Sequence, residues 1–452
     1  MLQNKPLNWS HANITPFRYT NQLSLNPLWN LGTTIHTAIK EEFSDDLKSI
    51  KITLNESDQI ARKSLQDPNA HYLFDDHPAL RKSISPNSIN NYNVVVILME
   101  SFAGSFVGKL GSTHNVTPYF DQLTDDGVLF NRMFSIGTRT NRGLSGTLLS
   151  FPALPRFKSI LMDASVDQNY SSLANVLKQR QYKSYFLFGG DLNYDNQYGF
   201  FTGQGFEYFI GKNDFKHDVF STVWGVADEY LFDKSFNILK TSKKPLFISI
   251  LTISNHPTYE IPLRRDFDPI SSERKNNKRL NAFKYSDFAL GEFMAKCKEE
   301  GFYKNTIFVI LGDHGMTSGP HHQNMSVDIA SYYIPCLIIA PELTPDINNR
   351  IASQIDIIPT ILDLLGGSFI HNSWGKNLFG ENNYIDFATI APSGMNHIMG
   401  IITDEFFYIY NFNDRNSHEL YSISNSNYPL QLNKLDSNQL IESSLEKNML
   451  GF

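Results

Sequence analysis

The sequence predicts an α/β protein: a mostly parallel sheet sandwiched by helices, with a smaller antiparallel β addition at the C-terminal end. Apolar strand patterns alternate with helical patterns from about residue 93 to residue 365, and this alternation is typical of a parallel sheet covered on both faces. The strand patterns are continuous apolar runs, as expected for strands buried on both sides. After Gly366 the pattern changes to short strands, at Ile398–Thr403 and Phe406–Tyr410.

The strands of the main sheet are predicted from apolar runs of about six residues bounded by glycine, proline or polar residues. In chain order they are Val94–Met99, Val128–Phe134, Ser184–Phe188, Pro245–Ile253, Ile307–Leu311 and Ile334–Ala340. Helices are predicted between them where apolar residues recur at helical spacing, at Val116–Asp126, Ser171–Arg180, Trp224–Leu239, Asn276–Glu300 and Ser353–Leu365. Pro118 fits the first turn of its helix, where a missing N–H costs nothing.

We divide the chain into three parts on these patterns. Residues 1–90 are polar and irregular, with helical possibilities at Thr34–Phe43 and Glu56–Leu65, and we expect an arm or linker that packs on the domain. We expect residues 91–368 to form the α/β core, which carries the candidate site residues described below. Residues 369–452 form a β-rich subdomain and tail.

Composition excludes several classes of protein. With 39 basic and 46 acidic residues the formal net charge is −7, which argues against a nucleic-acid-binding protein. Two cysteines make neither a disulfide framework nor a metal site. No stretch approaches the roughly 18 to 20 apolar residues of a membrane span. The N-terminal residues lack the pattern of a signal peptide. We expect the soluble part of a protein whose membrane anchor is missing from this chain.

Polar residues of catalytic type follow three of the predicted strands. Glu100 comes directly after the first strand, His256 follows Pro245–Ile253, and the pair Asp313 and His314 follows Ile307–Leu311. The carboxyl ends of parallel strands meet at one edge of a sheet, where ligands bind. Carboxylates and imidazole together suit a divalent cation. An Asp-His pair alone is more typical of an ordinary turn than of a metal site, so the prediction depends on all three strands.

A candidate nucleophile lies in the segment Gly-Thr-Arg-Thr-Asn-Arg-Gly at 137–143. A hydroxyl at the start of a following helix would face backbone N–H groups that favour phosphate, and Arg139 and Arg142 carry compensating charge. Thr138 and Thr140 are both candidates. Helix capping is the alternative role for each threonine, and spacing alone leaves that choice open.

Four segments together resemble the alkaline-phosphatase/sulfatase superfamily, and within it the lipoteichoic acid synthase branch of phosphoglycerol transferases. They are Met-Glu-Ser at 99–101, the threonine segment at 137–143, Ser-Asn-His-Pro at 254–257 and Leu-Gly-Asp-His-Gly at 311–315. The likeness runs from about residue 90 to residue 425 and includes the segment at 354–366 and Glu-Leu-Tyr at 419–421. Each piece alone is weak, but the combination is specific.

The resemblance implies a catalytic centre and a reaction. It implies Glu100, Thr140, Asp313 and His314 as ligands of one divalent metal, most often manganese and sometimes magnesium or zinc. It implies Thr140 as the nucleophile that forms a covalent phospho-threonine intermediate, and His256 as a substrate-phosphate ligand or proton donor. It also implies a donor such as phosphatidylglycerol, a glycan or glycerol-phosphate acceptor, and action at the periplasmic or extracellular face of the bacterial cytoplasmic membrane.

Two departures from the family pattern bear on substrate and reaction. The nucleophile segment has no cysteine, which argues against a formylglycine sulfatase. The loop that carries Trp and Arg in the synthases carries Asp191, Asn193 and Asp195 here, so we expect Asp191 and Asn193 to contact the substrate together with Arg142, His256 and His322. Two alternatives stay open: a phosphodiesterase or sulfatase-type hydrolase, and a catalytically silent lipid- or glycan-binding module.

Overall fold

The protein is seen in a computed structural model that describes residues 53–435. The description leaves out residues 66, 75–76, 78, 156–158, 162–169, 271–276, 317–324, 381–385, 394–396, 415–417 and 426–430. The predicted helix at Thr34–Phe43 and the predicted substrate ligand His322 lie outside the described residues.

Nine strands of the described chain form the central sheet, and every neighbouring pair that does not include β9 runs parallel as predicted. The strands along the sheet are β10 (Asp346–Asn348), β4 (Val128–Phe134), β9 (Tyr333–Ile339), β8 (Thr306–Gly312), β3 (Asn93–Met99), β7 (Leu246–Leu251), β5 (Lys183–Phe188) and β6 (Tyr208–Ile210), while β11 (Ala352–Ser353) also pairs with β4. Strand β9 runs antiparallel to both β8 and β4. The prediction of a mostly parallel α/β sheet is therefore confirmed.

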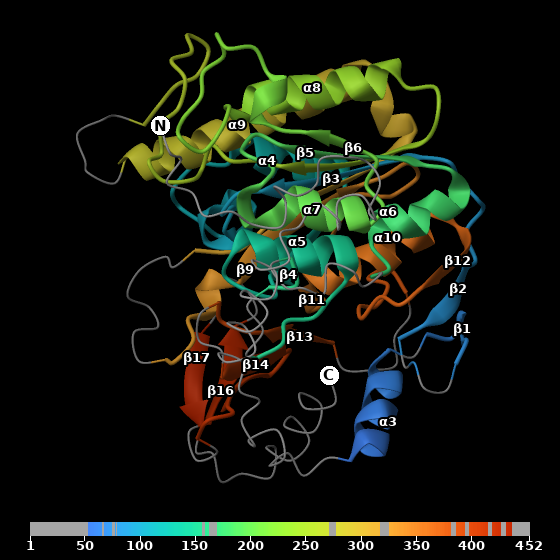
Figure 1. Ribbon diagram of the computed structural model, residues 1–452. Helices are drawn as coiled ribbons and strands as arrows, with labels where there is room; N and C mark the ends of the chain where they lie inside the picture. The colour runs from blue at the N-terminus through green and yellow to red at the C-terminus, as the bar shows by residue number, and fades with distance from the viewer. Residues whose placement is uncertain are drawn as a thin grey trace, which may run out of the picture.

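Helices cover both faces of this sheet (Figure 1). One face carries α4 (Pro118–Leu123), α8 (Asp228–Thr241) and α9 (Asn277–Glu299); the other carries α5 (Thr140–Leu149), α6 (Leu173–Leu177), α7 (Gln197–Gly203) and α10 (Ile357–Leu365). Alternate residues of β3 enter opposite cores: Val95 and Ile97 pack toward α8 and α9, and Val96 packs toward α5 and α6. This burial on both sides explains why the strand sequences are continuously apolar.

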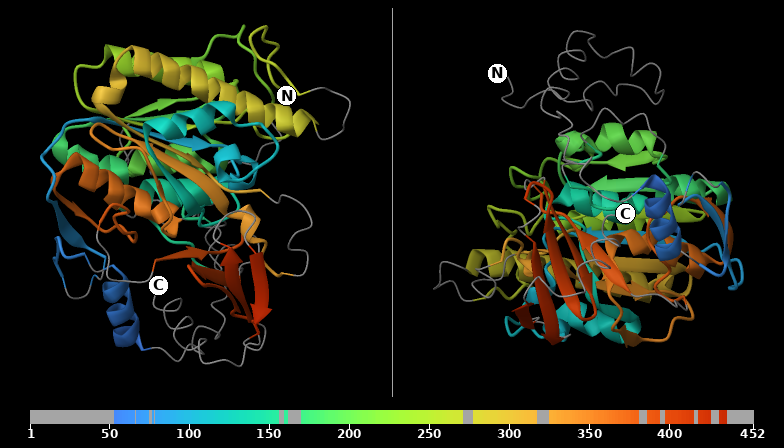
Figure 2. Two further views of the ribbon diagram at one scale, coloured as in Figure 1. Left: turned by 180° about the vertical axis from the view of Figure 1, so that it is seen from behind. Right: turned by 90° about the horizontal axis from the view of Figure 1, so that it is seen from below.

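The predicted antiparallel addition is a separate five-stranded sheet. It contains β13 (Phe387–Ile390), β14 (Ile398–Thr403), β15 (Phe406–Asn411), β16 (Glu419–Asn425) and β17 (Gln431–Leu435), all paired antiparallel. Figure 2 shows this red and orange sheet set apart from the main sheet. Its apolar residues, among them Ile402 and Phe407, join the same core cluster as α4 and α9.

The polar segment before residue 90 contains α3 (Leu54–Ser64), close to the predicted helix Glu56–Leu65, and two strands. Strand β2 (Arg81–Ser85) pairs with β1 (Ala70–Tyr72) and with β12 (Gly367–His371). The buried Arg81 guanidinium donates hydrogen bonds to the carbonyl oxygens of Ser373 and Gly375. The division of the chain at residues 90 and 368 stays a prediction.

Candidate active site

Glu100 lies at the carboxyl end of β3, in the interior of the protein. Its side chain is 6% exposed, and its backbone N–H donates to the Thr252 hydroxyl at 2.9 Å. Ser101, which follows with a positive φ of 51°, donates its hydroxyl to Glu100 Oε1 at 2.8 Å. This left-handed residue turns the chain sharply after the strand, so the carboxylate is fixed at the edge of the sheet.

Asp313 and His314 lie at the end of the neighbouring strand, β8, which pairs in parallel with β3 through Met99 and Gly312. Asp313 is fully buried, and its Oδ1 accepts the backbone N–H groups of Ser101 and His314, both at 2.7 Å. The Nδ1–H of His314 is placed to donate to the carbonyl of Gly315 at 2.8 Å, because a carbonyl oxygen only accepts. That hydrogen bond leaves Nε2 as the metal-binding nitrogen of the ring.

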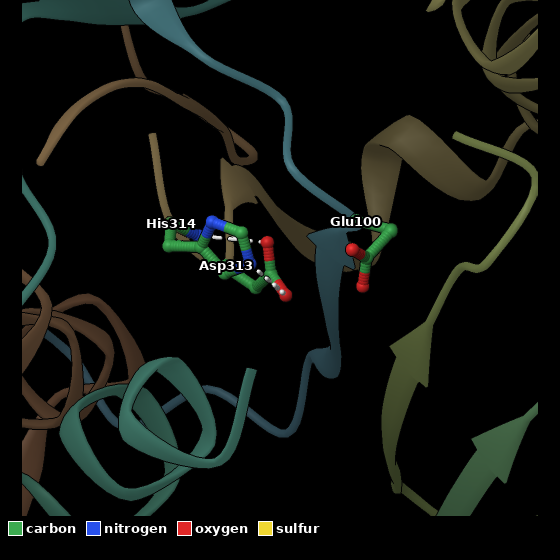
Figure 3. A group of neighbouring side chains, drawn as sticks. All are labelled: Glu100, Asp313 and His314. Atoms are coloured by element: carbon green, nitrogen blue, oxygen red, sulfur yellow. Dashed lines mark hydrogen bonds and ion pairs between the residues drawn. The ribbon is translucent and has the colours of Figure 1, made fainter. Parts of the chain in front are cut away.

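These three side chains form a cluster that suits a divalent metal (Figure 3). One ligand atom from each of Glu100, Asp313 and His314 lies within 4.8 Å of the others. The Oδ2 atom of Asp313 is buried and accepts no hydrogen bond. His314 Nε2 lies 3.7 Å from this oxygen. A buried carboxylate oxygen without a hydrogen bond is costly, and a metal ion between these atoms would satisfy it. The residues therefore fit the metal that the family resemblance implies.

Electrostatics at the cluster also favour a cation. Burial, with the neighbouring Asp313 carboxylate, raises the pKa of Glu100 to about 7. Burial lowers the pKa of His314, but the charges of Asp313 and Glu100 outweigh it and the net pKa lies above the ordinary value. The proximity of the two carboxylates contributes to both raised pKa values, and a divalent ion would relieve the repulsion between them.

Thr140 is the first residue of α5 and faces the cluster. Its Oγ1 donates to Glu100 Oε2 at 3.3 Å, and its side chain is only partly buried. The helix can approach this closely because its fourth residue is Gly143, where an added Cβ would lie 2.2 Å from the carbonyl oxygen of Asp313. Thr138 lies two residues before the helix begins, whereas the Thr140 hydroxyl reaches Glu100, so the geometry favours Thr140 of the two candidate nucleophiles.

His256 is the third strand-end residue, on the loop after β7. The charge of its imidazole lowers the pKa of Glu100, against the larger effects of burial and Asp313 that raise it. Nδ1 lies 2.8 Å from the carbonyl oxygen of Pro257, and the ring packs on Trp224 with 4.0 Å between centroids. Tyr194, 44% exposed, also packs edge-on against Trp224, with 5.9 Å between ring centroids. These aromatic residues form one wall beside the cluster.

The other predicted substrate ligands among the described residues are Arg142, Asp191 and Asn193. Arg142 is 4% exposed and its guanidinium interacts with Tyr332, and burial lowers its pKa to about 10. Asp191 pairs with Lys212 at 3.7 Å and accepts the backbone N–H of Asn193, so both loop residues also shape the loop itself. Their contact with substrate stays a prediction.

Sequence reasoning missed several residues that complete the site. Asn255 Nδ2 donates to the carbonyl oxygens of Glu100 and Ser101 at 3.1 and 3.3 Å. Gln354 Nε2 donates to the carbonyl of Asp313 at 2.8 Å. Trp224 and Tyr194 form the wall described above. Asn255 and Gln354 lie within segments that carry the family resemblance, so they could have been predicted from the sequence. No sequence pattern indicates a role for Tyr194.

A comparison with known families identifies residues 92–368 as a match to the sulfatase family model. The chain belongs to the sulfatase family. A lipoteichoic acid synthase-like protein of Bacillus subtilis is 25% identical over 293 residues, which cover 61% of this chain and 47% of that protein. The chain spans about half the length of the curated relatives it matches.

Solved structures of the superfamily share the fold. A protein of the alkaline phosphatase superfamily from Vibrio parahaemolyticus has a TM-score of 0.76 and 27% identity, covering 88% of this chain and 95% of that one. A lipoteichoic acid synthase of Listeria monocytogenes has a TM-score of 0.68 and 20% identity over the same shares. The chain is thus a sulfatase-superfamily enzyme related to lipoteichoic acid synthases. None of the helices in the described part is long and apolar enough to span a membrane.

Proposed function

We propose that the protein is a metal-dependent phosphoglycerol, or related phospholipid head-group, transferase that acts on the outer side of the cytoplasmic membrane. The observation that carries the proposal is the Thr140 hydroxyl, 3.3 Å from Glu100 and directed at the cluster of Glu100, Asp313 and His314. The match to lipoteichoic acid synthases supports a phospholipid donor such as phosphatidylglycerol and a glycan or glycerol-phosphate acceptor.

We assign Glu100, Asp313 and His314, together with the Thr140 hydroxyl, as the ligands of the metal. Three oxygen donors and one imidazole suit manganese, with magnesium or zinc as the other possibilities. The bound ion would lower the pKa of the Thr140 hydroxyl and neutralise charge on the transferring phosphoryl group.

The residues of the chain then divide the reaction between them. The hydrogen bond from Thr140 to Glu100 gives the hydroxyl proton an acceptor. Oγ1 of Thr140 attacks the phosphorus of the phosphodiester, and the bond from phosphorus to the diacylglycerol oxygen breaks. His256, held by Trp224 and by the Pro257 carbonyl, enters this step as an imidazolium, and its Nε2–H protonates that leaving oxygen. In the second step the acceptor hydroxyl attacks the phosphorus and gives up its proton to the same imidazole, while the bond from phosphorus to Thr140 Oγ1 breaks and Oγ1 takes its proton back from Glu100.

A covalent-adduct experiment tests this proposal. The protein with Mn²⁺ is incubated briefly with phosphatidylglycerol and analysed by peptide mass spectrometry. We expect a phosphoglycerol adduct on Thr140 that is absent from Thr140→Ala and retained in Thr138→Ala. An adduct on Thr138 would move the nucleophile, and no adduct on either threonine would contradict the proposal in favour of the binding-module alternative.

The fate of the head group separates transferase from hydrolase. With a glycan or glycerol-phosphate acceptor present, a transferase yields the extended acceptor, and its yield rises with acceptor concentration. Free glycerol phosphate as the sole product, at every acceptor concentration, would instead identify a phosphodiesterase.

A further inference from the structure

Asp228 is a fully buried carboxylate whose hydrogen bonds leave its own helix. It is the first residue of α8, yet its Oδ1 accepts the backbone N–H groups of Ile253 and Ser254 at 2.9 and 3.0 Å. Its Oδ2 accepts the Ser286 hydroxyl from α9 at 2.9 Å, and its own N–H donates to the Ser254 hydroxyl at 2.9 Å. Four hydrogen bonds therefore tie two helices to the chain that leaves β7, and none of the four is an ordinary helix cap.

The segment that Asp228 fixes is the one that holds Glu100. Thr252, immediately before the two bonded residues, accepts the N–H of Glu100 through its hydroxyl at 2.9 Å. Asn255, immediately after them, donates its side-chain amide to the carbonyl oxygens of Glu100 and Ser101. The backbone around Glu100 is thus bonded on both sides to residues 252–255, whose position depends on Asp228.

The hydrogen bonds from Asp228 through residues 252–255 also extend to Asp313, at the end of β8. The N–H of Ser101 donates to Asp313 Oδ1 at 2.7 Å, so the turn after β3 also orients the Asp313 carboxylate. His256 follows Asn255 directly and packs on Trp224, four residues before Asp228. The buried Asp228 carboxylate is therefore connected, through residues 252–255, to the segments that carry Glu100, Asp313 and His256.

We propose that Asp228 is a positioning residue for the metal cluster, acting through residues 252–255 to hold Glu100 and Asp313 at metal-binding distance. The inference rests on the proposed function only in taking these two carboxylates as metal ligands. Groups that orient metal ligands commonly change metal affinity by about 10- to 100-fold when removed. A residue that merely supports the fold would lower stability without a specific effect on metal affinity.

The chain offers a matched control, Asp287 on α9. It is also fully buried, and it also accepts two backbone N–H groups, those of Tyr119 and Phe120, at 2.9 and 2.7 Å. Its partners belong to the start of α4 and not to the loop after β7. Loss of either carboxylate leaves two backbone N–H groups without an acceptor, so the two alanine variants carry similar costs in stability.

Calorimetric titration of the metal-free protein with MnCl₂ tests the proposal. We expect Asp228→Ala to raise the Kd for Mn²⁺ by about tenfold or more, and Asp287→Ala to leave it within about twofold of the wild type because its partners lie outside the site. Asp228→Asn should restore most of the affinity, since the amide oxygen accepts the same two N–H groups and the amide nitrogen donates to Ser286.

Equal Kd values for the two alanine variants, or no rescue by asparagine, would overturn the proposal. If Asp228→Ala does not fold, Ser254→Ala removes the hydroxyl that accepts the Asp228 N–H and should raise the Kd in the same direction; an unchanged Kd there also overturns the proposal. The Kd for Mn²⁺ is measured without lipid. A missing Thr140 adduct would therefore contradict the proposed transferase function without affecting the positioning role of Asp228. If Asp228→Ala keeps both normal Mn²⁺ affinity and normal adduct formation, the positioning role of Asp228 is refuted and the proposed transferase function is unaffected.

Discussion

Gly143→Ala should push α5, and with it the proposed nucleophile Thr140, away from the proposed metal ligands. The added Cβ would lie 2.2 Å from the Asp313 carbonyl oxygen and 2.9 Å from its carbon, whereas real Cβ contacts essentially never fall below 3.0 Å. The two backbones must therefore part by at least 0.8 Å. Asp313 cannot easily retreat, because Gln354 holds its carbonyl and Met99 accepts its N–H. The displacement falls on α5 and on Thr140.

A misplacement of about 1 Å costs about 10²-fold in rate, which corresponds to about 2.7 kcal/mol of activation free energy. We expect kcat for head-group transfer to fall by that factor. Because alanine is the better helix former by about 1 kcal/mol, part of the cost in stability is offset. The assay is release of diacylglycerol from labelled phosphatidylglycerol at saturating Mn²⁺, followed beside thermal unfolding.

Gly146→Ala is the control on the same helix. Its added Cβ would meet only side-chain atoms, of Gln354 and Ile136, at 3.0 to 3.2 Å, and these can shift by a few tenths of an ångström. It should keep kcat within about threefold of the wild type. If Gly143→Ala retains the activity of Gly146→Ala, the close contact between α5 and Asp313 does not set the position of Thr140, and the reasoning is refuted.

Three further predictions follow from buried contacts. Glu100→Ala and Asp313→Ala should each lose bound metal in elemental analysis while remaining folded by circular dichroism; wild-type metal content in both would remove the assigned site. Trp224→Ala should lower kcat by about 2- to 10-fold, the value of one aromatic contact, and Trp224→Phe should recover it if stacking on His256 is the cause. Burial raises the pKa of Asp287 to about 8; a raised acid pKa stabilises the fold below the unfolded value near 4, and this contribution disappears as the pH rises through about 8. Asp287→Asn should therefore flatten the fall of Tm between pH 4 and 8, and an unchanged slope would contradict the assignment.

Much of the fold followed from local patterns. Burial on both faces makes β3 and β8 continuously apolar, so their positions were predicted within a residue. The helix expected at Trp224–Leu239 begins at Asp228 instead, because Gly225 pairs with Gly190 and keeps the preceding residues extended. The direction of β9 could not be predicted, since an apolar run looks the same in either orientation.

The sequence by itself determined which residues end the strands, and therefore that Glu100, Asp313 and His314 would share an edge of the sheet with His256. It did so because strand periodicity and abrupt polar ends are local properties. Only the tertiary structure decided that Thr140 rather than Thr138 reaches Glu100, that Gly143 lets α5 lie against Asp313, and that Asp228 is bonded to the loop after β7. Each of these depends on which segments become neighbours across the sheet, and no single segment encodes that.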